Sequence, residues 1–297
     1  MSAGGNFSAA IAGAGLAHNL GGFAQLAAGR GIAENPAPPD ISELAVALPG
    51  VALRRIPRYA RLALLAAIRA LDDAGWRQVP DPGDLALVIG TAYSGVQMSL
   101  DFMDSMLDGG ARLASPTAFS YAVNNMAAGL LSLLLHVQGP CLTVSQFELS
   151  FAGAVFAATA WLHAGRARRV LAGAVDETDE RFTRCCPQTG KTGVPQTEGA
   201  VFLCLELPDP ARPELRVRWE QGGAAPHPVF ASGSAQDGGG AFFSHEQLYG
   251  HSPLAQALDT LLALHAVRQG TAARIDCLCA AQARRRAAVI EVRGPQP

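Results

Sequence analysis

The stretch that decides the fold runs from Gly139 to Ala164 and reads GPCLTVSQFELSFAGAVFAATAWLHA. Gly139-Pro140 breaks the preceding element, and Leu142 to Val144 is a short apolar run typical of a strand. From Phe147 to Ala164 the chain is almost wholly apolar, and a helix that is apolar on all sides must be enclosed by other elements. We therefore expect a strand, a turn and a buried helix at the centre of the fold.

Strands and helices alternate on both sides of this stretch, which predicts an α/β protein. After Pro208 the pattern weakens, and residues 222–240, which are rich in Gly, Ala, Pro and Ser, are typical of a loop. The expected strands are Ala9 to Ala14, Leu85 to Ile89, Arg169 to Ala174, Val201 to Leu205, and one or two near Cys277 to Cys279 and Ala287 to Val292. The expected helices are Arg58 to Ala74, Met98 to Leu107 and Pro253 to Arg268.

Composition narrows the possible partners. The 297 residues are 49% hydrophobic and only 16% charged, with a formal net charge of -2. No basic field favours nucleic acid or an anionic membrane, and the low charge suggests that a protein partner covers some apolar surface. The apolar runs Met126 to Leu135 and Phe151 to Leu162 are too short to span a bilayer. Six cysteines without a CxxC pair, and no signal peptide, predict a reduced cytoplasmic protein with no metal or cofactor.

An ordered set of segments resembles the β-ketoacyl synthases of the thiolase superfamily, over roughly residues 9–206. The resemblance implies a five-layered α/β/α/β/α fold built from two related halves. Here these would be residues 1–206 and a truncated second half, residues 207–297, forming one compact unit. The segments that carry the resemblance are Ile11 to Gly15, Leu62 to Gly75, Val88 to Thr91, Ser115-Pro116, Gly139-Pro140, Leu142 to Ser145 and Gly199 to Val201.

The turn before the buried helix departs from the family pattern. The family places a cysteine at the head of this helix, where the helix dipole lowers the thiol pKa and backbone N–H groups form an oxyanion hole. Where ketosynthases have Thr-Val-Ser-Thr-Ala-Cys, this chain has Thr143-Val144-Ser145-Gln146-Phe147-Glu148. Glu148 therefore stands in the cysteine position, and a carboxylate is too weak a nucleophile to store an acyl chain. Cys141 is expected to lie before the strand, too far from the turn to replace it.

The second half has also lost family features. The family's His-Gly-Thr motif is missing, whereas His251 resembles the second family histidine, with Glu246 where the family has lysine. The closing Gly-Phe-Gly-Gly loop is replaced by Cys279 to Arg286. The piece from Leu207 to Phe243 is too short for a complete second half, which suggests an internal deletion.

Proteins that keep this fold and lose the cysteine are known as chain-length factors. The resemblance therefore implies a non-catalytic subunit, closest to the factors of aryl polyene and related type II polyketide pathways. Such a subunit pairs with an active ketosynthase, completes its acyl tunnel and meets acyl carrier protein through the complex. The residues expected at the tunnel or the interface are Met103, Met106, Phe119, Asn124, Leu142, Thr143, Val144, Gln146 and Phe147.

Other interpretations stay open at this point. Glu148 and His251 could support decarboxylation of a malonyl thioester, or the chain could be a degenerate homodimer with a regulatory role. Glu148 could equally serve only as an electrostatic cap of the helix. The acidic run of Asp176, Glu177, Asp179 and Glu180 is typical of a solvated loop.

Two glycine motifs suggest nucleotide binding only weakly. Gly13 and Gly15 could open a dinucleotide fingerprint, but His18 stands where the third glycine should be. Gly190-Lys191-Thr192 resembles a phosphate loop, yet its upstream glycine is replaced by Cys185 and Pro195 would block the following helix. Neither motif therefore predicts a nucleotide site.

Overall fold

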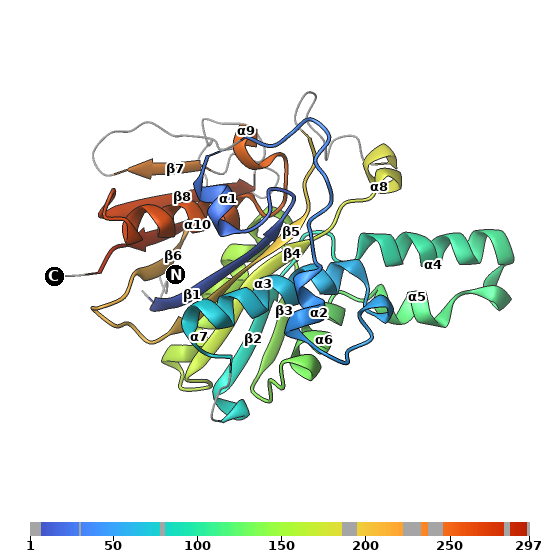
Figure 1. The fold of residues 1–297 in the computed structure, drawn as a ribbon, viewed down its shortest axis with the longest axis horizontal. Coiled ribbons are helices and arrows are strands. Elements are labelled where there is room, and N and C mark those ends of the chain that lie inside the picture. Colours follow the sequence, from blue (N-terminus) through green and yellow to red (C-terminus); the bar gives the residue numbers. More distant parts are fainter. Residues whose placement is uncertain are drawn as a thin grey trace.

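The computed structural model describes residues 7–29, 31–77, 81–185, 195–221, 233–236, 246–281 and 286–295. Within these ranges nine strands join in one sheet, in the order β3-β2-β4-β5-β1-β6-β9-β8-β7 (Figure 1). Among the described residues, no helix is both long enough and apolar enough to cross a membrane.

The first part of the sheet is built from β3 (Cys141–Val144), β2 (Leu85–Gly90), β4 (Arg169–Asp176), β5 (Gly199–Glu206) and β1 (Ser8–His18). The first three strands are parallel, and β5 runs antiparallel to both of its neighbours. Except for β3, these strands are buried nearly throughout, because helices cover both faces. One face packs on α3 (Arg58–Ala74) and α6 (Met126–Leu134), and the other on α7 (Ser150–His163).

Close packing of β1 on α3 explains the glycines of the supposed dinucleotide motif. A Cβ on Gly15 would collide with the carbonyl oxygen of Ala66, and one on Gly13 would come within 2.6 Å of the carbonyl oxygen of Ala70. These glycines let a strand and a helix approach each other, so they have a structural reason that requires no nucleotide.

The second part of the sheet contains β6 (Glu214–Gln221), β9 (Arg286–Arg293), β8 (Arg274–Ala281) and β7 (Gly233–Gln236), all antiparallel. Only three residue pairs, from Ser8↔Arg216 to Ala10↔Glu214, join it to β1. Helix α7 packs on strands of both parts, and α10 (Ala255–Arg268) packs on α7, β8 and β9. One hydrophobic core therefore runs from β2 and β4 through these two helices to β8 and β9. The predicted α/β class is confirmed.

Several boundaries differ from expectation. Residues 222–240, predicted as a loop, include strand β7, and β6 was not predicted. The central helix begins at Ser150, because a 3₁₀ turn, η4 (Phe147–Leu149), precedes it. Cys141 is the first residue of β3 and does not lie before the strand. Division of the chain at residue 206 stays a prediction, although β5 ends at Glu206.

One hairpin of helices projects from the body (Figure 1). It consists of α4 (Val96–Gly109), η3 (Ala111–Leu113) and α5 (Pro116–Tyr121), and we call it the α4–α5 hairpin. The remaining short elements are α1 (Phe23–Ala27), α2 (Glu43–Ala47), η1 (Leu53–Arg55), η2 (Pro82–Asp84), α8 (Glu180–Cys185) and α9 (Glu246–Tyr249).

Candidate functional site

The turn between β3 and α7 is held by a buried hydroxyl. The backbone N–H of Gln146 donates to Ser150 Oγ at 2.9 Å, and that Oγ lies 2.9 Å from the Thr91 carbonyl oxygen and 2.7 Å from that of Phe147. Phe147 has a φ of 52°, an uncommon conformation for a residue with a side chain. Ser150 therefore has a structural role, because its hydroxyl holds the turn together. Phe147 lies in a strained backbone conformation, and its ring is half exposed.

Glu148 faces the second part of the sheet. Its carbonyl oxygen accepts a hydrogen bond from Cys279 Sγ of β8 at 3.4 Å. Burial raises the pKa of Cys279, and the nearby charge of Glu148 raises it further. This buried thiol is therefore held neutral, although it touches the turn where the family carries its nucleophile. Cys141 lies at the far end of β3 from the turn.

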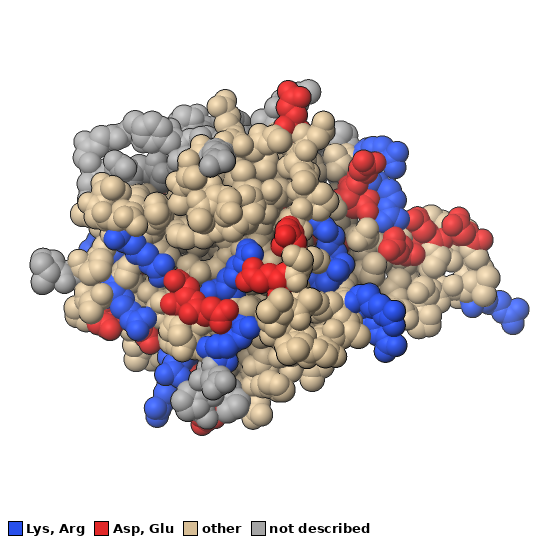
Figure 2. All heavy atoms as spheres, in the orientation of Figure 1, with Lys and Arg blue, Asp and Glu red and all other residues tan. Residues whose placement is uncertain are grey.

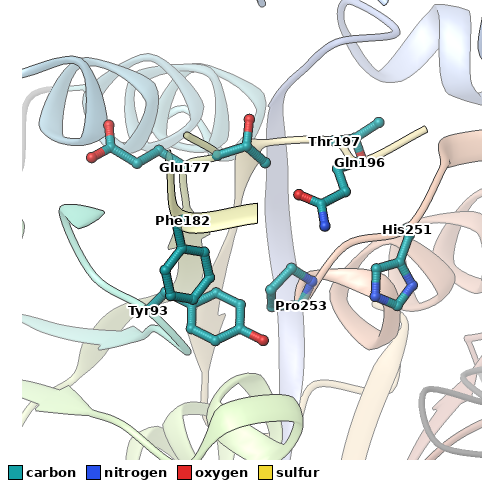
Figure 3. A pocket seen from close by; sticks show the side chains of 8 residues that line it. Tyr93, Glu177, Phe182, Gln196, Thr197, His251 and Pro253 are labelled. Carbon is teal, nitrogen blue, oxygen red and sulfur yellow. The ribbon is translucent and has the colours of Figure 1, made fainter. Parts of the chain in front are cut away.

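His251 is buried between α9 and α10 and is fixed through its backbone. Its N–H donates to the Pro195 carbonyl oxygen at 2.8 Å, and its carbonyl oxygen accepts from the Thr197 N–H at 3.0 Å. The ring lines a small cavity (Figure 3). The other residues that line it are Tyr93, Glu177, Thr178, Phe182, Gln196, Thr197 and Pro253. Glu148 is not among them, so the cavity does not bring together the pair that the decarboxylase interpretation needs.

The cavity is too small for an acyl chain. Its volume is about 20 Å³, which is room for roughly one water molecule. Aromatic rings occupy one side of it, with Tyr93 packed against Phe182 at 4.9 Å between ring centroids and against Phe147 at 6.3 Å. An acyl tunnel would therefore have to lie elsewhere, such as along a surface completed by a partner.

The acidic run that begins at the last residue of β4 is not a solvated loop in its first half. Asp176 and Glu177 are both buried, which corrects the interpretation from the sequence. Asp176 accepts hydrogen bonds from Thr91 Oγ1 at 3.0 Å and from the N–H groups of Ala92 and Tyr93 at 3.0 and 2.8 Å. Burial raises its pKa to about 6, although these hydrogen bonds pull it down. Asp176 therefore braces the loop that follows β2.

Glu177 anchors the α4–α5 hairpin. It accepts from the Gln97 N–H at 3.0 Å, and burial raises its pKa to about 7 against the lowering effect of that bond. Its carboxyl group points away from His251, on the opposite side of the cavity (Figure 3). Nearby, Glu198 accepts from Arg58 Nε at 3.1 Å and from the Thr178 N–H at 3.3 Å. Carboxylates in such a run can thus be structural where they accept backbone hydrogen bonds, as Asp176, Glu177 and Asp179 do.

The residues predicted for a tunnel or an interface are exposed or partly exposed. Nine of the twelve exposed large hydrophobic side chains of the described residues fall between residues 103 and 147. Met103, Met106 and Phe119 lie on the α4–α5 hairpin, with exposed fractions of 51%, 37% and 56%, and Asn124 is exposed just after it. Leu142, Thr143 and Val144 form β3, the edge strand of the sheet, and Gln146 and Phe147 follow it.

The edge strand carries one buried hydroxyl without a hydrogen bond. Thr143 Oγ1 is buried and has no hydrogen-bond partner among the described residues. A buried hydroxyl without a partner costs stability. No group of three or more His, Cys, Asp or Glu side chains in the described ranges could hold a metal ion. Gly190-Lys191-Thr192 lies outside those ranges.

A buried helix behind a tight turn, in a mixed sheet packed between helices, is the arrangement expected of a thiolase-like ketosynthase fold. Residues 29–193, more than half of the chain, match the family described as "Beta-ketoacyl synthase, N-terminal domain". The chain therefore belongs to this family.

Known proteins agree with this assignment. The chain is 24% identical over 179 residues to the chloroplastic 3-oxoacyl-acyl-carrier-protein synthase I of Hordeum vulgare, which covers 52% of this chain and 39% of that protein. The chain thus spans about two fifths of that relative's length. Among solved structures, "The ishigamide ketosynthase/chain length factor" is similar with a TM-score of 0.75 and 18% identity, covering 97% of this chain and 99% of that one. A ketosynthase in complex with its chain length factor from Xenorhabdus doucetiae gives 0.66 and 16%, covering 95% and 98%. These two likenesses establish the fold.

Proposed function

We propose that the protein is a non-catalytic, chain-length-factor-like subunit that pairs with an active ketosynthase. It would serve a type II polyketide pathway, of the aryl polyene type or a related fatty-acid-like one. The observation that carries the proposal is the turn before α7. Where the family has its nucleophile this chain has Gln146, Phe147 and Glu148, and the thiol in contact with the turn, that of Cys279, is buried and held neutral.

The exposed edge of the sheet supports a heterodimer. Strand β3 is short, half exposed and unpaired on its outer side within the described chain, and Leu133 of α6 and Leu142 add exposed apolar surface. Unpaired edges that carry apolar side chains favour association with another strand. A stable partner of this size would bury well over ~2,000 Å².

The hairpin supports a role in limiting product length. Its exposed side chains Met103, Met106 and Phe119 would form the floor of a tunnel that crosses the interface. Each buried CH₂ of an acyl chain contributes about 0.8 kcal/mol until the floor is reached, after which steric overlap costs about 1–3 kcal/mol. That reversal is steep enough to stop elongation within about one cycle.

Reconstitution with the cognate ketosynthase tests the pairing. We expect a one-to-one complex in gel filtration, and Leu142→Lys should weaken it strongly because a charge would enter the interface. Leu207→Lys is the matched control, since Leu207 is an exposed leucine (51%) that follows β5 in the chain. A Leu142→Lys variant that binds as tightly as the control would exclude β3 from the interface.

Mass spectrometry tests the absence of catalysis. After incubation with acyl or malonyl carrier protein, no residue of this chain should carry a stable thioester. Glu148→Cys alone should not create a condensing enzyme, since the His-Gly-Thr histidine is absent from the sequence. An adduct on any residue of the unaltered chain would contradict the proposal, and Cys141 is the exposed thiol to inspect first.

A further inference from the structure

The α4–α5 hairpin has little apolar attachment to the body. Of the fourteen residues of α4 only Val96 is buried, and of the six of α5 only Ala118. The two helices hold each other through Phe102 and Phe119, whose ring centroids lie 5.3 Å apart, and through the Ser115 N–H, which donates to Ser105 Oγ at 3.0 Å. The elements that pack most on α4 are α5, η3 and α8. Something other than a hydrophobic core must therefore set the angle of the hairpin.

Arg181 of α8 makes the polar link. Its Nη1 donates to Asp104 Oδ2 at 2.7 Å and its Nη2 to Asp101 Oδ1 at 2.9 Å. Asp101 and Asp104 stand three residues apart, so they project from one face of α4. Figure 2 shows acidic and basic atoms meeting where α8 approaches the hairpin. A planar guanidinium that contacts two carboxylates fixes direction as well as distance.

The same guanidinium is oriented from the body. Arg181 Nε and Nη2 donate to the two oxygens of Asp179, at 3.1 and 2.9 Å, and the Arg181 N–H donates to Asp179 Oδ1 at 2.7 Å. The Asp179 side chain is only 9% exposed. Hydrogen bonds from Arg181 lower the pKa of Asp179, so this carboxylate stays charged. Asp179 thus orients Arg181 from the body of the protein, while Arg181 binds the two aspartates of α4.

Two links of different kind attach the hairpin along its length. Glu177 holds the first turn of α4 through the Gln97 N–H, and Arg181 holds its second and third turns through Asp101 and Asp104. Both come from the segment that directly follows β4, a strand in the centre of the first part of the sheet. Residues 177–181 therefore attach the hairpin to the sheet and fix its position.

We propose that Arg181 is a positioning residue that clamps the α4–α5 hairpin to the body through Asp101 and Asp104, and so sets the surface that the hairpin presents to a partner. The clamp itself needs no partner. Its consequence for a ketosynthase rests on the proposed function. An isolated exposed ion pair contributes little to global stability, so the effect belongs to the local opening of the hairpin and not to the core.

Hydrogen–deuterium exchange of the full-length chain tests the clamp. In Arg181→Ala, amides of residues 98–121 should exchange about threefold to tenfold faster, while β2 and β4 should keep wild-type rates. Arg181→Lys should lie between the two, because lysine keeps the charge but cannot form the fork. Arg268→Ala is the matched control, since Arg268 pairs with Asp73 at 3.1 Å with similar exposure (30% against 33%) and lies far along the chain.

A double-mutant cycle separates clamping from mere destabilisation. Asp101→Asn combined with Asp104→Asn should accelerate exchange in the hairpin as Arg181→Ala does, and adding Arg181→Ala to that pair should accelerate it little further, because the same contacts are already lost. Wild-type exchange over residues 98–121 in Arg181→Ala would overturn the clamp, whatever a ketosynthase does. Faster exchange with an unchanged dissociation constant for the ketosynthase would leave the clamp standing and count against the hairpin's place in the interface.

Discussion

The two parts of the sheet differ in how their two faces are covered. Strands β2, β4 and β5 are buried at nearly every residue, because α3 and α6 cover one face and α7 the other. Strands β6, β8 and β9 place one face against α7 and α10, with Ile275, Cys277 and Ile290 in the core. Their other face meets no described helix and carries charged side chains. The second part of the sheet is therefore folded without a described helix over its outer face.

Ion pairs between strands of the second part, both adjacent strands and strands one apart, replace that layer. Asp276 of β8 pairs with Arg218 of β6 at 3.0 Å, and Arg274 of β8 pairs with Glu291 of β9 at 3.1 Å. Opposite charges at nearby positions stabilise a sheet face, even where residues such as Val289 and Glu291 of β9 are buried on it. Asp276 and Glu291 stand opposite each other in the register, and the surrounding arginines compensate their repulsion. A charged face also discourages association of this sheet with other molecules.

The largest expected effect is a difference in unfolding free energy between two leucine-to-alanine changes, one on the face beneath α3 and one on the charged face. Leu171 of β4 is fully buried beneath α3, whereas Leu278 of β8 is only partly buried on the charged face. Leu171→Ala should lower the free energy of unfolding by about 2–5 kcal/mol, and Leu278→Ala by less than ~1 kcal/mol. Urea unfolding followed by circular dichroism gives both values. Similar losses at the two positions would mean that the second face is covered after all.

The next effect is a change of stability with pH that arises from buried carboxyl groups in the first part of the sheet. The pKa of Asp176 is raised from 3.8 to about 6 and that of Glu177 from 4.5 to about 7, in both cases because burial disfavours the charge. A group whose pKa is higher in the folded state binds more protons when folded. Its contribution to stability is complete below the unfolded pKa and is lost as pH rises through the folded pKa. For Glu177 this loss, about 3 kcal/mol, falls between about pH 4.5 and 7.

Glu177→Gln measures this term directly. The amide oxygen can still accept from the Gln97 N–H, but no charge forms, so the variant should gain on the wild type by about 2–3 kcal/mol as pH rises from 4.5 to 7. Carboxylates with lowered pKa, such as Asp179, give the opposite slope and cancel in the difference. Glu34→Gln removes an exposed carboxylate and serves as the control. A difference that stays constant with pH would show that Glu177 is charged at no cost.

The contrast between the two parts also explains which elements could be predicted from the sequence. Continuous apolar runs such as Leu85 to Ile89 report a strand that is buried on both faces, and these elements were correct. Strand β6 alternates Leu215 and Val217 with Arg216 and Arg218, which gives a weaker signal after a proline-rich segment. The placement of Glu148 in the cysteine position follows from a chemical requirement tied to one position, and it stays a prediction. The burial of Asp176 and Glu177 could not, since their partners are backbone N–H groups brought close only by folding.

The smallest expected effect lies within the charged face itself. Glu291 is only 5% exposed and sits between Arg274, at 3.1 Å, and Arg293, at 2.5 Å. Glu214 on the neighbouring strand is 22% exposed and, among the described residues, pairs with Arg216 at 3.4 Å. Glu291→Gln should cost about 1–3 kcal/mol, because Arg293 and Arg274 lose the carboxylate that they share, although Asp276 still pairs with Arg274 at 2.8 Å. Glu214→Gln should cost less than ~0.5 kcal/mol, as expected of a single, partly exposed pair with a long contact. Urea unfolding at low salt and at 1 M salt measures both, and screening should shrink the small term more than the large one. If the two variants lose equal stability, the outer face is held by strand pairing alone, and the ion pairs contribute nothing in place of the absent helical layer.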